Sequence, residues 1–404
     1  MAGVLDGVRV LDLSRILAGP WSTQLLADLG AEVIKIERPG VGDDTRTWGP
    51  PFAENEGGKE AAYFMSANRG KKSLTLDFTK PEGRDVIYKL VESCDVLVEN
   101  FKYLGLEKYG LDYTRIQAIN PKIIYCSITG FGQTGPLKSR AGYDFLMQGM
   151  GGLMSITGEA ETEAHGGPQK VGVAVADLFT GLYASNAIIA ALFHCLKTGE
   201  GQYVDLALLD CQVAVLANQA MNAFVSGDTP KRMGNAHINI VPYQVFEASD
   251  GHLILAVGND LQFGKFCEIA GCAELASDAR FATNPARVAN RNILIPMLEE
   301  IMLKRGRDEW IGLFESAAVP CGPINTINQV FEEEQIQARA LKVNLPHATL
   351  GTVPLVGCPI KYSNTPIEYT QGPPTLGEHT HQVLKDIVML EETDIKLLKE
   401  KNII

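Results

Sequence analysis

One carboxylate stands at the head of a long apolar run, where it could act as a nucleophile. The run VGVAVADLFTGLYASNAIIAALFHC, residues 171–195, contains a single formal charge, Asp177. Burying a carboxylate without a partner is costly, so Asp177 must be either satisfied by the backbone or used. Asp just before a helix is a favoured N-cap, and we expect Asp177 to cap the helix that follows. There the helix N-terminus would keep the carboxylate ionised, so it would need no partner base.

A glycine-rich loop, GFGQTG at residues 130–135, matches the dinucleotide-binding pattern and follows a predicted strand. Pro136 and the aperiodic stretch LKSRAGYD come next, whereas a dinucleotide site needs a helix whose N-terminus receives the pyrophosphate. We therefore interpret these glycines as a close-packed loop, not as a nicotinamide or flavin site.

Metal and hydrolase motifs find little support. HTH at residues 379–381 is better explained as a turn that enters a helix than as a pair of metal ligands. The eight cysteines are scattered without a C-x-x-C pair, which predicts buried reduced thiols. The sequence has neither H-E-x-x-H nor G-x-S-x-G, and we predict no metal site.

The net charge of the chain limits the kinds of ligand and partner that it can bind. A formal net charge of −12 and a pI near 5.2 argue against nucleic acid or an anionic membrane. An anionic ligand must then be met by a local basic patch. Five basic residues near predicted strand ends either form such a patch for a phosphate-rich ligand or make ion pairs at the surface: Arg38, Arg69, Lys71, Lys72 and Lys108.

The N-terminal stretch MAGVLDGVRVLDLS shows no secretory signal, and we expect a cytoplasmic protein. A mitochondrial matrix enzyme that had lost its transit peptide would look the same. The apolar run at 171–195 is interrupted by Asp177, Asn186 and two glycines, so we do not expect it to span a membrane.

Strands and helices alternate through the first half of the chain, which predicts a parallel sheet covered on both faces. Expected strands are residues 8–13, 31–37, 95–100, 122–128 and 203–208, and expected helices are 20–30, 81–94, one that Asp177 introduces and Gly199 ends, and 209–224.

A chain of 404 residues exceeds the usual size of one core, so we expect two domains. We expect a large α/β domain to begin with residues 1–205 and a linker helix to occupy 206–227. A small α+β domain would follow at 228–325, and a return segment, 326–404, would complete the large domain.

Several stretches, in order and over nearly the whole chain, resemble the class III CoA-transferases, the CaiB/BaiF family of formyl-CoA transferase and carnitine CoA-transferase. They are LDLSRILAGPWSTQLLADLGAEVIKIERPGVGDDTR, NRGKKSLTLDFTKPEGR, DVLVENF, SITGFGQTGP, VGVAVADLFTGLYA and LGEHT. Within the family, RMGNAHINIVPYQVF and VPCGPIN are most similar to the succinyl-CoA–glutarate CoA-transferase branch.

The resemblance implies that Asp177 is the catalytic residue. Its carboxylate would attack the donor acyl-CoA to give an aspartyl anhydride and CoA thiolate, which would return to form an aspartyl-CoA thioester. An acceptor acid would reverse these steps. The implied donor is succinyl-CoA and the implied acceptor a dicarboxylate such as glutarate, with itaconate, malate, citramalate and mesaconate still open. CoA would be a substrate, with no prosthetic group.

The resemblance also implies a set of CoA-binding residues and an architecture. The expected contacts are Ile16, Leu17, Arg38, Leu76, Asn100, Phe101, Lys108, Tyr109, Arg140 and, near the reacting centre, Tyr143. The implied fold is an open Rossmann-like parallel-sheet domain interrupted by a smaller α+β domain, in an interlocked homodimer.

One loop departs from the family pattern. Formyl-CoA transferase covers its aspartate with a tetraglycine loop, and the corresponding stretch here reads GNAHINIV. Its bulkier residues His237 and Asn235 are candidates for holding the far carboxylate of a dicarboxylic acid, and a simple loop histidine is the alternative.

Two other functions remain open. An α-methylacyl-CoA racemase also has Asp at this position but needs a second acid/base, and it places His where this chain has Tyr143, a poor base at neutral pH. A non-catalytic acyl-CoA-binding protein would have no reason to keep the nucleophile.

Overall fold

The computed structural model describes residues 3–161 and 166–404, and the chain divides into two compact units. Unit 1 comprises Met1–Leu153, Val171–Met221 and Gln335–Ile404, and unit 2 comprises Met154–Lys170 and Asn222–Glu334. Unit 2 therefore takes in residues 154–170 and 326–334, which the sequence-based boundaries assigned to the large domain.

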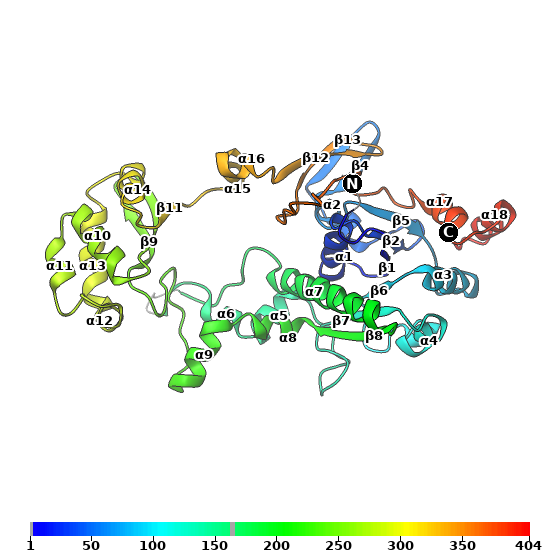
Figure 1. Cartoon of the computed structure of the whole chain (residues 1–404), viewed down its shortest axis with the longest axis horizontal. Coiled ribbons are helices and arrows are strands. Elements are labelled where there is room, and N and C mark those ends of the chain that lie inside the picture. The colour runs from blue at the N-terminus through cyan, green and yellow to red at the C-terminus, as the bar shows by residue number, and fades with distance from the viewer. Residues whose placement is uncertain (1–2, 162–165) are drawn as a thin grey trace. The chain divides into compact units, whose positions relative to one another are not determined.

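Unit 1 is built on a six-stranded sheet in the order β5-β2-β1-β6-β7-β8, in which every neighbouring pair is parallel (Figure 1). The strands are β1 (Arg9–Asp12), β2 (Glu32–Glu37), β5 (Lys71–Thr75), β6 (Val96–Glu99), β7 (Ile124–Thr129) and β8 (Gln202–Ala207). The predicted parallel sheet is confirmed.

Two apolar clusters, one on each face, bury this sheet between layers of helices. One face carries α3 (Pro81–Ser93), α4 (Tyr113–Ile119), α17 (Thr380–Asp386) and α18 (Glu392–Glu400). The other carries α1 (Ala18–Asp28), α5 (Asp144–Met150), α7 (Val175–Thr198) and α8 (Leu208–Ala214). In β6 the side chains alternate between the two clusters, with Leu97 on one side and Val96 and Val98 on the other.

The order of the strands reverses between β1 and β6. From β1 the chain moves outward through β2 and β5, and it then returns to the other side of β1 with β6. Such a switch point is where open parallel sheets bind ligands, outside the carboxyl ends of the strands. The loops after β1 and after β6 should therefore form the walls of a site.

Smaller elements complete unit 1. These are η1 (Asp44–Thr47), the hairpin β3 (Phe52–Asn55) and β4 (Gly58–Ala61), α2 (Ala62–Ser66), η2 (Glu107–Tyr109), α16 (Glu334–Ala338), which starts at the unit boundary, and the hairpin β12 (Lys342–His347) and β13 (Gly351–Val356). The C-terminal segment packs on the sheet edge, where the Thr75 amide donates to Thr380 Oγ1 at 3.0 Å.

Unit 2 holds a three-stranded antiparallel sheet, β11 (Cys321–Pro323), β10 (Gly251–Ala256) and β9 (Tyr243–Ala248). Its helices are α6 (Leu153–Ile156), α10 (Asp260–Ala270), α11 (Ala273–Ser277), α12 (Asn284–Ala289), α13 (Arg291–Met302), α14 (Arg307–Ser316) and α15 (Ile327–Glu332). Stacked rings form its core, with centroids 5.2 Å apart for Trp310 and Phe314 and 5.5 Å for Phe266 and Phe314.

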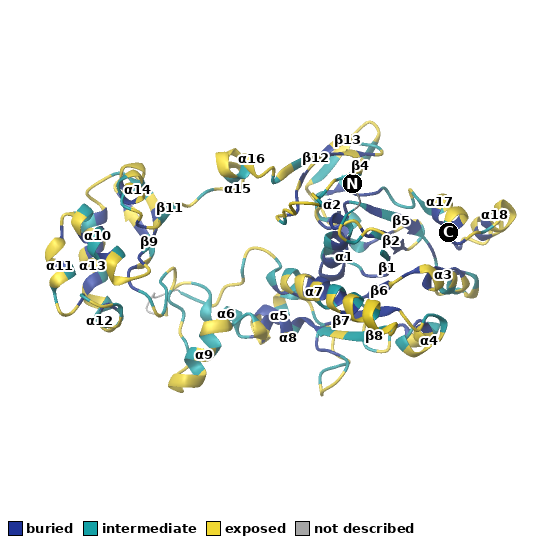
Figure 2. Cartoon of the chain, in the orientation of Figure 1, coloured by how far each residue is buried: buried dark blue, intermediate teal, exposed yellow. Residues whose placement is uncertain are grey.

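Two predicted helices differ in the structure. The helix expected at 209–224 is broken into α8 and α9 (Ala217–Ser226), and Ala217 at the break has a φ of 44°. The long helix α7 ends as predicted, at Gly199 with a φ of 80°, but it begins at Val175. By length and composition alone α7 could cross a membrane. A soluble core helix passes the same test, and one side of α7 is buried on the sheet (Figure 2).

Candidate active site

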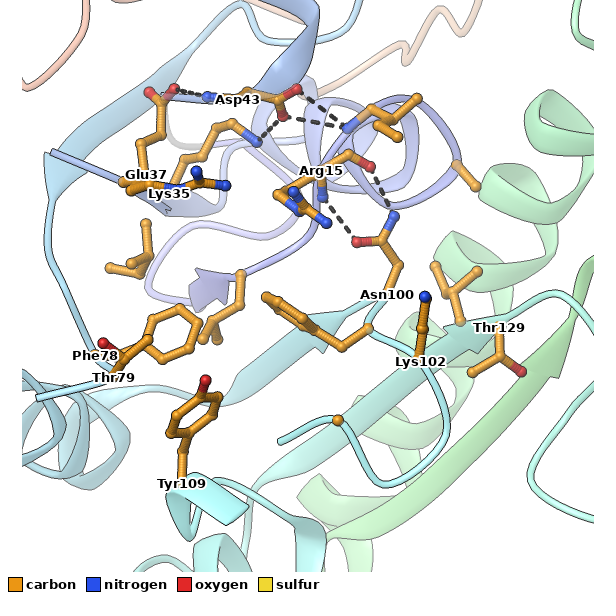
Figure 3. Close-up of a pocket in the computed structure, with 18 of the residues that line it drawn as sticks. Arg15, Lys35, Glu37, Asp43, Phe78, Thr79, Asn100, Lys102, Tyr109 and Thr129 are labelled. Carbon is orange, nitrogen blue, oxygen red and sulfur yellow. Dashed lines mark hydrogen bonds and ion pairs between the residues drawn. The ribbon is translucent and has the colours of Figure 1, made fainter. Parts of the chain in front are cut away.

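A cavity of about 1110 Å³ opens in unit 1 at the carboxyl edge of the sheet (Figure 3). Its walls come from the loops that follow β1, β2, β5, β6 and β7, and from the first turn of α7. This is the place that the switch point between β1 and β6 predicts. The volume is at the upper end of what small-molecule and cofactor sites enclose.

The cavity lining brings together eleven of the residues that sequence reasoning selected. They are Asp177, Ile16, Leu17, Arg38, Leu76, Asn100, Phe101, Lys108, Tyr109, Arg140 and Tyr143. Sequence reasoning missed Arg15, Phe78, Lys102, Tyr103, Thr129 and Lys138, which also line it. Most of these lie within two or three positions of a selected residue. Their place in the same loops, just after predicted strands, could have identified them.

Cations and aromatic rings are paired around the cavity. Lys138 Nζ lies 4.6 Å from the centre of the Tyr103 ring, and Lys108 Nζ lies 4.7 Å from that of Tyr109. The Arg140 guanidinium is 5.5 Å from the Phe131 ring. In a chain of net charge −12, this local excess of cations suits an anionic ligand with a flat apolar part.

Three of the five basic residues proposed as a patch belong to other parts of the fold. Lys71 is fully buried, with Nζ 3.1 Å from Asp12 Oδ2, while Arg69 pairs with Asp28 and Lys72 with Glu32, at 2.5 and 2.6 Å. For these three the ion-pair alternative applies and not the patch, because their side chains turn toward acids of the sheet and α1, although Arg69 and Lys71 are buried and not at the surface. Only Arg38 and Lys108 line the cavity.

The expected capping role of Asp177 is wrong, because another residue performs it. Helix α7 begins two residues earlier, and Asp177 is the third residue of its first turn. Asp144, at the start of α5, accepts hydrogen bonds through Oδ1 from the amides of Ala176 at 2.8 Å and Asp177 at 3.4 Å. Gln148 Nε2 donates to the other oxygen of Asp144 at 2.7 Å. The donors that would have stabilised the Asp177 carboxylate are thus used by Asp144.

The surroundings of Asp177 penalise its negative charge. Burial, and then the negative charge of Asp144, raise the pKa of Asp177 to about 7. The expectation of an ordinary, fully ionised carboxylate is therefore wrong: near pH 7 the protonated and ionised forms are about equally populated. Burial and the charges of Asp177 and Asp144 also raise the pKa of Tyr63.

A second acid in the cavity wall has the opposite environment. Asp43 pairs with the fully buried Lys35, with Nζ and Oδ2 2.8 Å apart, and it accepts the amide of Thr45 at 3.0 Å. Burial alone would raise the pKa of Asp43, but the charge and hydrogen bond of Lys35 lower it to about 2. This carboxylate is permanently ionised and already partnered.

His237 and Asn235 belong to unit 2, in the loop before β9. The His237 amide donates to the Tyr243 carbonyl at 2.9 Å, and its Nδ1 accepts the Asn239 amide at 3.0 Å. Their role toward a substrate stays a prediction.

The remaining motifs have local explanations. His379 precedes α17 and accepts the Ser73 amide at 3.3 Å, as expected of a turn that enters a helix. No helix follows the glycine loop until Asp144, and Gly130 approaches Gly142 too closely for a side chain. Within residues 3–161 and 166–404, no group of three His, Cys, Asp or Glu is arranged to hold a metal ion.

The fold and cavity match those of a known enzyme family. The family model for CoA-transferase family III matches residues 5–380. The chain is 52% identical to succinate–glutarate CoA-transferase of Agrobacterium fabrum over 96% of this chain and 97% of that protein. It is 45% identical to human succinyl-CoA:glutarate CoA-transferase, over 97% of this chain and 87% of the human one.

A solved structure agrees. The crystal structure of a CaiB/BaiF family protein from Brucella suis is 52% identical, with a TM-score of 0.84, and covers 96% of this chain and 100% of that one. The chain belongs to CoA-transferase family III, and it is an enzyme of the CoA-transferase type.

Proposed function

We propose that this enzyme moves CoA from succinyl-CoA to a dicarboxylate, with glutarate as the first acceptor to test, and that Asp177 carries the acyl group and then the CoA. The relatives named for succinate or succinyl-CoA and glutarate support the substrates. One observation supports the nucleophile: Asp177 lines a cation-rich cavity but has its pKa raised by burial and Asp144. A carboxylate that its surroundings stabilise poorly is more reactive than one held by an ion pair.

The net reaction exchanges one carboxylate for another, in steps in which a carboxylate and the CoA thiolate displace each other in turn. An Asp177 oxygen attacks the thioester carbonyl, the C–S bond breaks, and CoA thiolate leaves with the bonding electrons. The thiolate then attacks the aspartyl carbonyl of the anhydride and releases succinate. The acceptor carboxylate attacks the aspartyl-CoA thioester, and the returning thiolate attacks the acceptor acyl carbon and frees Asp177. No proton is transferred, so the chemistry needs no general base.

The cavity suits CoA in both charge and shape. Arg38, Lys108 and Arg140 would bind the phosphates through charge-assisted hydrogen bonds. The apolar lining residues Leu17 and Leu76 would contact the pantetheine chain and the adenine. Dryness around Asp177 would protect the anhydride and thioester from water.

The raised pKa of Asp177 also favours a second function, because a carboxyl group that titrates near pH 7 is suited to acid/base chemistry. A racemase would remove and return an α-proton with Asp177 and a second group. Tyr143, 65% exposed in the cavity wall, is a poor candidate for that group. Incubation with a chiral 2-methylacyl-CoA in deuterated buffer without an acceptor acid separates the two functions, because α-deuterium uptake would establish racemisation.

We further propose a homodimer. Helix α7 exposes large apolar residues near its C-terminal end, with Phe193 59% and Leu196 85% exposed (Figure 2). Exposed apolar side chains of this size on a helix are typical of a protein interface. Sedimentation equilibrium of the wild type and Leu196→Glu tests the proposal, which predicts a dimer that the charge weakens; a monomeric wild type contradicts it.

The decisive experiment for the function is to trap the intermediate. Protein mixed with succinyl-CoA and quenched in mid-reaction should carry a CoA adduct on the peptide that contains Asp177, by mass spectrometry. Asp177→Ala should carry none and show no transfer to glutarate, while still binding CoA. An adduct on another side chain would overturn the mechanism, and transfer by the variant would overturn the role of Asp177.

A further inference from the structure

The loop between β1 and α1 contains a strained residue in the wall of the cavity. Ile16 has a φ of 72°, in the left-handed region that β-branched residues rarely adopt. A conformation of this kind persists only where the surroundings determine it, and it is common at ligand sites. Ile16 lies between Arg15 and Leu17, and all three residues line the cavity.

Side chains from β2, from the loop after β2 and from the loop after β6 hold the backbone of this loop. Asn100 accepts the Arg15 amide through Oδ1 at 2.8 Å and donates from Nδ2 to the Arg15 carbonyl at 2.7 Å. The Ile16 amide donates to both oxygens of Asp43, at 3.3 and 3.2 Å. Lys35 Nζ donates to the Ser14 carbonyl at 2.8 Å. Figure 3 shows the Asn100 side chain turned toward the Arg15 backbone.

These contacts bridge the switch point of the sheet. Asn100 is the first residue after β6, and Arg15 and Ile16 follow β1, so the two hydrogen bonds of Asn100 join the two loops where the strand order reverses. One donor and one acceptor of the Asn100 amide are thereby committed to protein backbone. A bound nucleotide would compete with the fold for them.

We propose that Asn100 and Asp43 are positioning residues that force Ile16 into its left-handed conformation, so that the Arg15–Leu17 wall of the cavity is formed before the ligand arrives. That the ligand is CoA rests on the proposed function. The role of Asn100 differs from the nucleotide contact that the family resemblance implies, since Asn100 would act through Ile16.

Relief of the strain gives a direct test. Glycine adopts positive φ freely, so Ile16→Gly removes the need for a clamp. Asn100→Ala should raise the Kd for CoA at least about tenfold in the otherwise wild-type enzyme, since clamped strain of this kind is worth about one to two tenfold factors. In the Ile16→Gly background the same substitution should raise the Kd by less than about threefold. Titration calorimetry with CoA measures all four proteins.

Asn120 provides a matched control. Its Nδ2 donates to the carbonyls of Val91 and Cys94 at 3.0 and 2.9 Å, and its Oδ1 accepts the Lys122 amide at 3.0 Å, but it does not line the cavity. Asn120→Ala removes similar backbone bonds from the same unit. It should leave the Kd for CoA within about twofold and should not couple to Ile16→Gly, because it is remote from that loop.

Urea unfolding of the same variants distinguishes failure of this inference from failure of the proposed function. If wild type does not bind CoA, the proposed function fails, and the coupling between Ile16→Gly and Asn100→Ala in unfolding midpoints still decides the clamp. If CoA binds and Asn100→Ala weakens binding equally in both backgrounds, Asn100 contacts the ligand and the clamp is wrong. If Asn100→Ala and Asn120→Ala weaken CoA binding by the same factor, the clamp is also wrong.

Discussion

Two carboxylates in the cavity wall, those of Asp43 and Asp177, have opposite electrostatic environments. Asp43 faces the fully buried Lys35 and two backbone amides, and its pKa falls to about 2. Asp177 has another acid, Asp144, as its charged neighbour, and its pKa rises to about 7. Burial penalises both charges, so the difference comes from their partners.

Within one site, Asp43 has a structural role, and Asp177 is the group proposed to react. Asp43 is held in an ion pair with Lys35 and accepts the Ile16 amide, so it helps to fix the loop that contains Ile16. A carboxylate stabilised in this way is a weaker nucleophile than an unpaired one. Among the described residues Asp177 makes no ion pair, and in the proposed mechanism the acyl group is transferred to it. Perturbed pKa values are concentrated at functional sites, which supports a functional role for Asp177.

Replacement of the reactive carboxylate should have the largest effect. Asp177→Asn keeps the size of the side chain but removes the nucleophile, and transfer from succinyl-CoA should fall by at least about 10⁴-fold. The Kd for CoA should change by less than about threefold, because the phosphates are bound elsewhere in the cavity. Steady-state assays with glutarate and titration with CoA measure the two effects. Substantial residual transfer would place the chemistry on another group.

Replacement of the paired carboxylate should mainly reduce stability. Asp43→Asn leaves Lys35 buried without its ion pair, which should lower the free energy of unfolding by about 3–5 kcal/mol. Urea unfolding at pH 7 measures the loss, with Asp44→Asn as the control because that residue makes a half-exposed pair with Arg15. A loss no larger than that of the control would mean that the Lys35 charge is satisfied by other groups.

Asp177 itself should be a stability liability at high pH. Its folded pKa lies above the unfolded value of 3.8, so the folded protein binds more protons and stability falls as pH rises from about 4 to about 7. Asp177→Asn cannot ionise and should gain about 1–3 kcal/mol over wild type at pH 8, and much less at pH 4.5. Unfolding midpoints at the two pH values give the comparison, and a constant difference would contradict the raised pKa.

The fold of unit 1 and the importance of Asp177 could be predicted from the sequence, but the role of Asp43 could not. Alternating apolar runs predict the strands and helices of unit 1, because local periodicity records burial. The same reasoning found Asp177 because a lone charge in an apolar run is conspicuous. It could not find the pairing of Lys71 with Asp12, since that contact depends on strand order, or that of Lys35 with Asp43, since it depends on how the loop after β2 folds back on the strand. It also misjudged the charge of Asp177, because Asp144 lies 33 positions away in the chain and meets it only in the fold.

The pH profile of the reaction should report the unpaired carboxylate. In the proposed mechanism the ionised form of Asp177 attacks, so kcat/KM for succinyl-CoA should rise with pH and level off above an apparent pKa near 7. Burial and the charges of Asp177 and Asp144 raise the pKa of Tyr63, so this tyrosine stays protonated over the same range. Assays from pH 5 to 8.5 at saturating glutarate measure the profile. If kcat/KM already reaches its plateau near pH 4, the pKa of Asp177 is not raised, and Asp177 does not differ from Asp43 in the way described.

Removal of the neighbouring charge should give the smallest and most specific effect. Asp144→Asn keeps an oxygen that can accept the Ala176 amide but removes the charge that helps to raise the pKa of Asp177. Burial remains the larger cause, so the apparent pKa of kcat/KM should fall by less than about one to two units. At pH 5.5 the variant should therefore retain a larger fraction of its plateau rate than wild type does.

Asp144→Glu is the matched control, because it keeps the charge while it disturbs the cap on α7. If Asp144 serves only to begin the helix, any loss of rate in either variant is the same at all pH values, and the midpoint of the profile does not move. A midpoint that moves with Asn and stays with Glu shows that the negative charge of Asp144 tunes the nucleophile. Asp43 and Asp177 then differ because of named neighbours, Lys35 for Asp43 and Asp144 for Asp177.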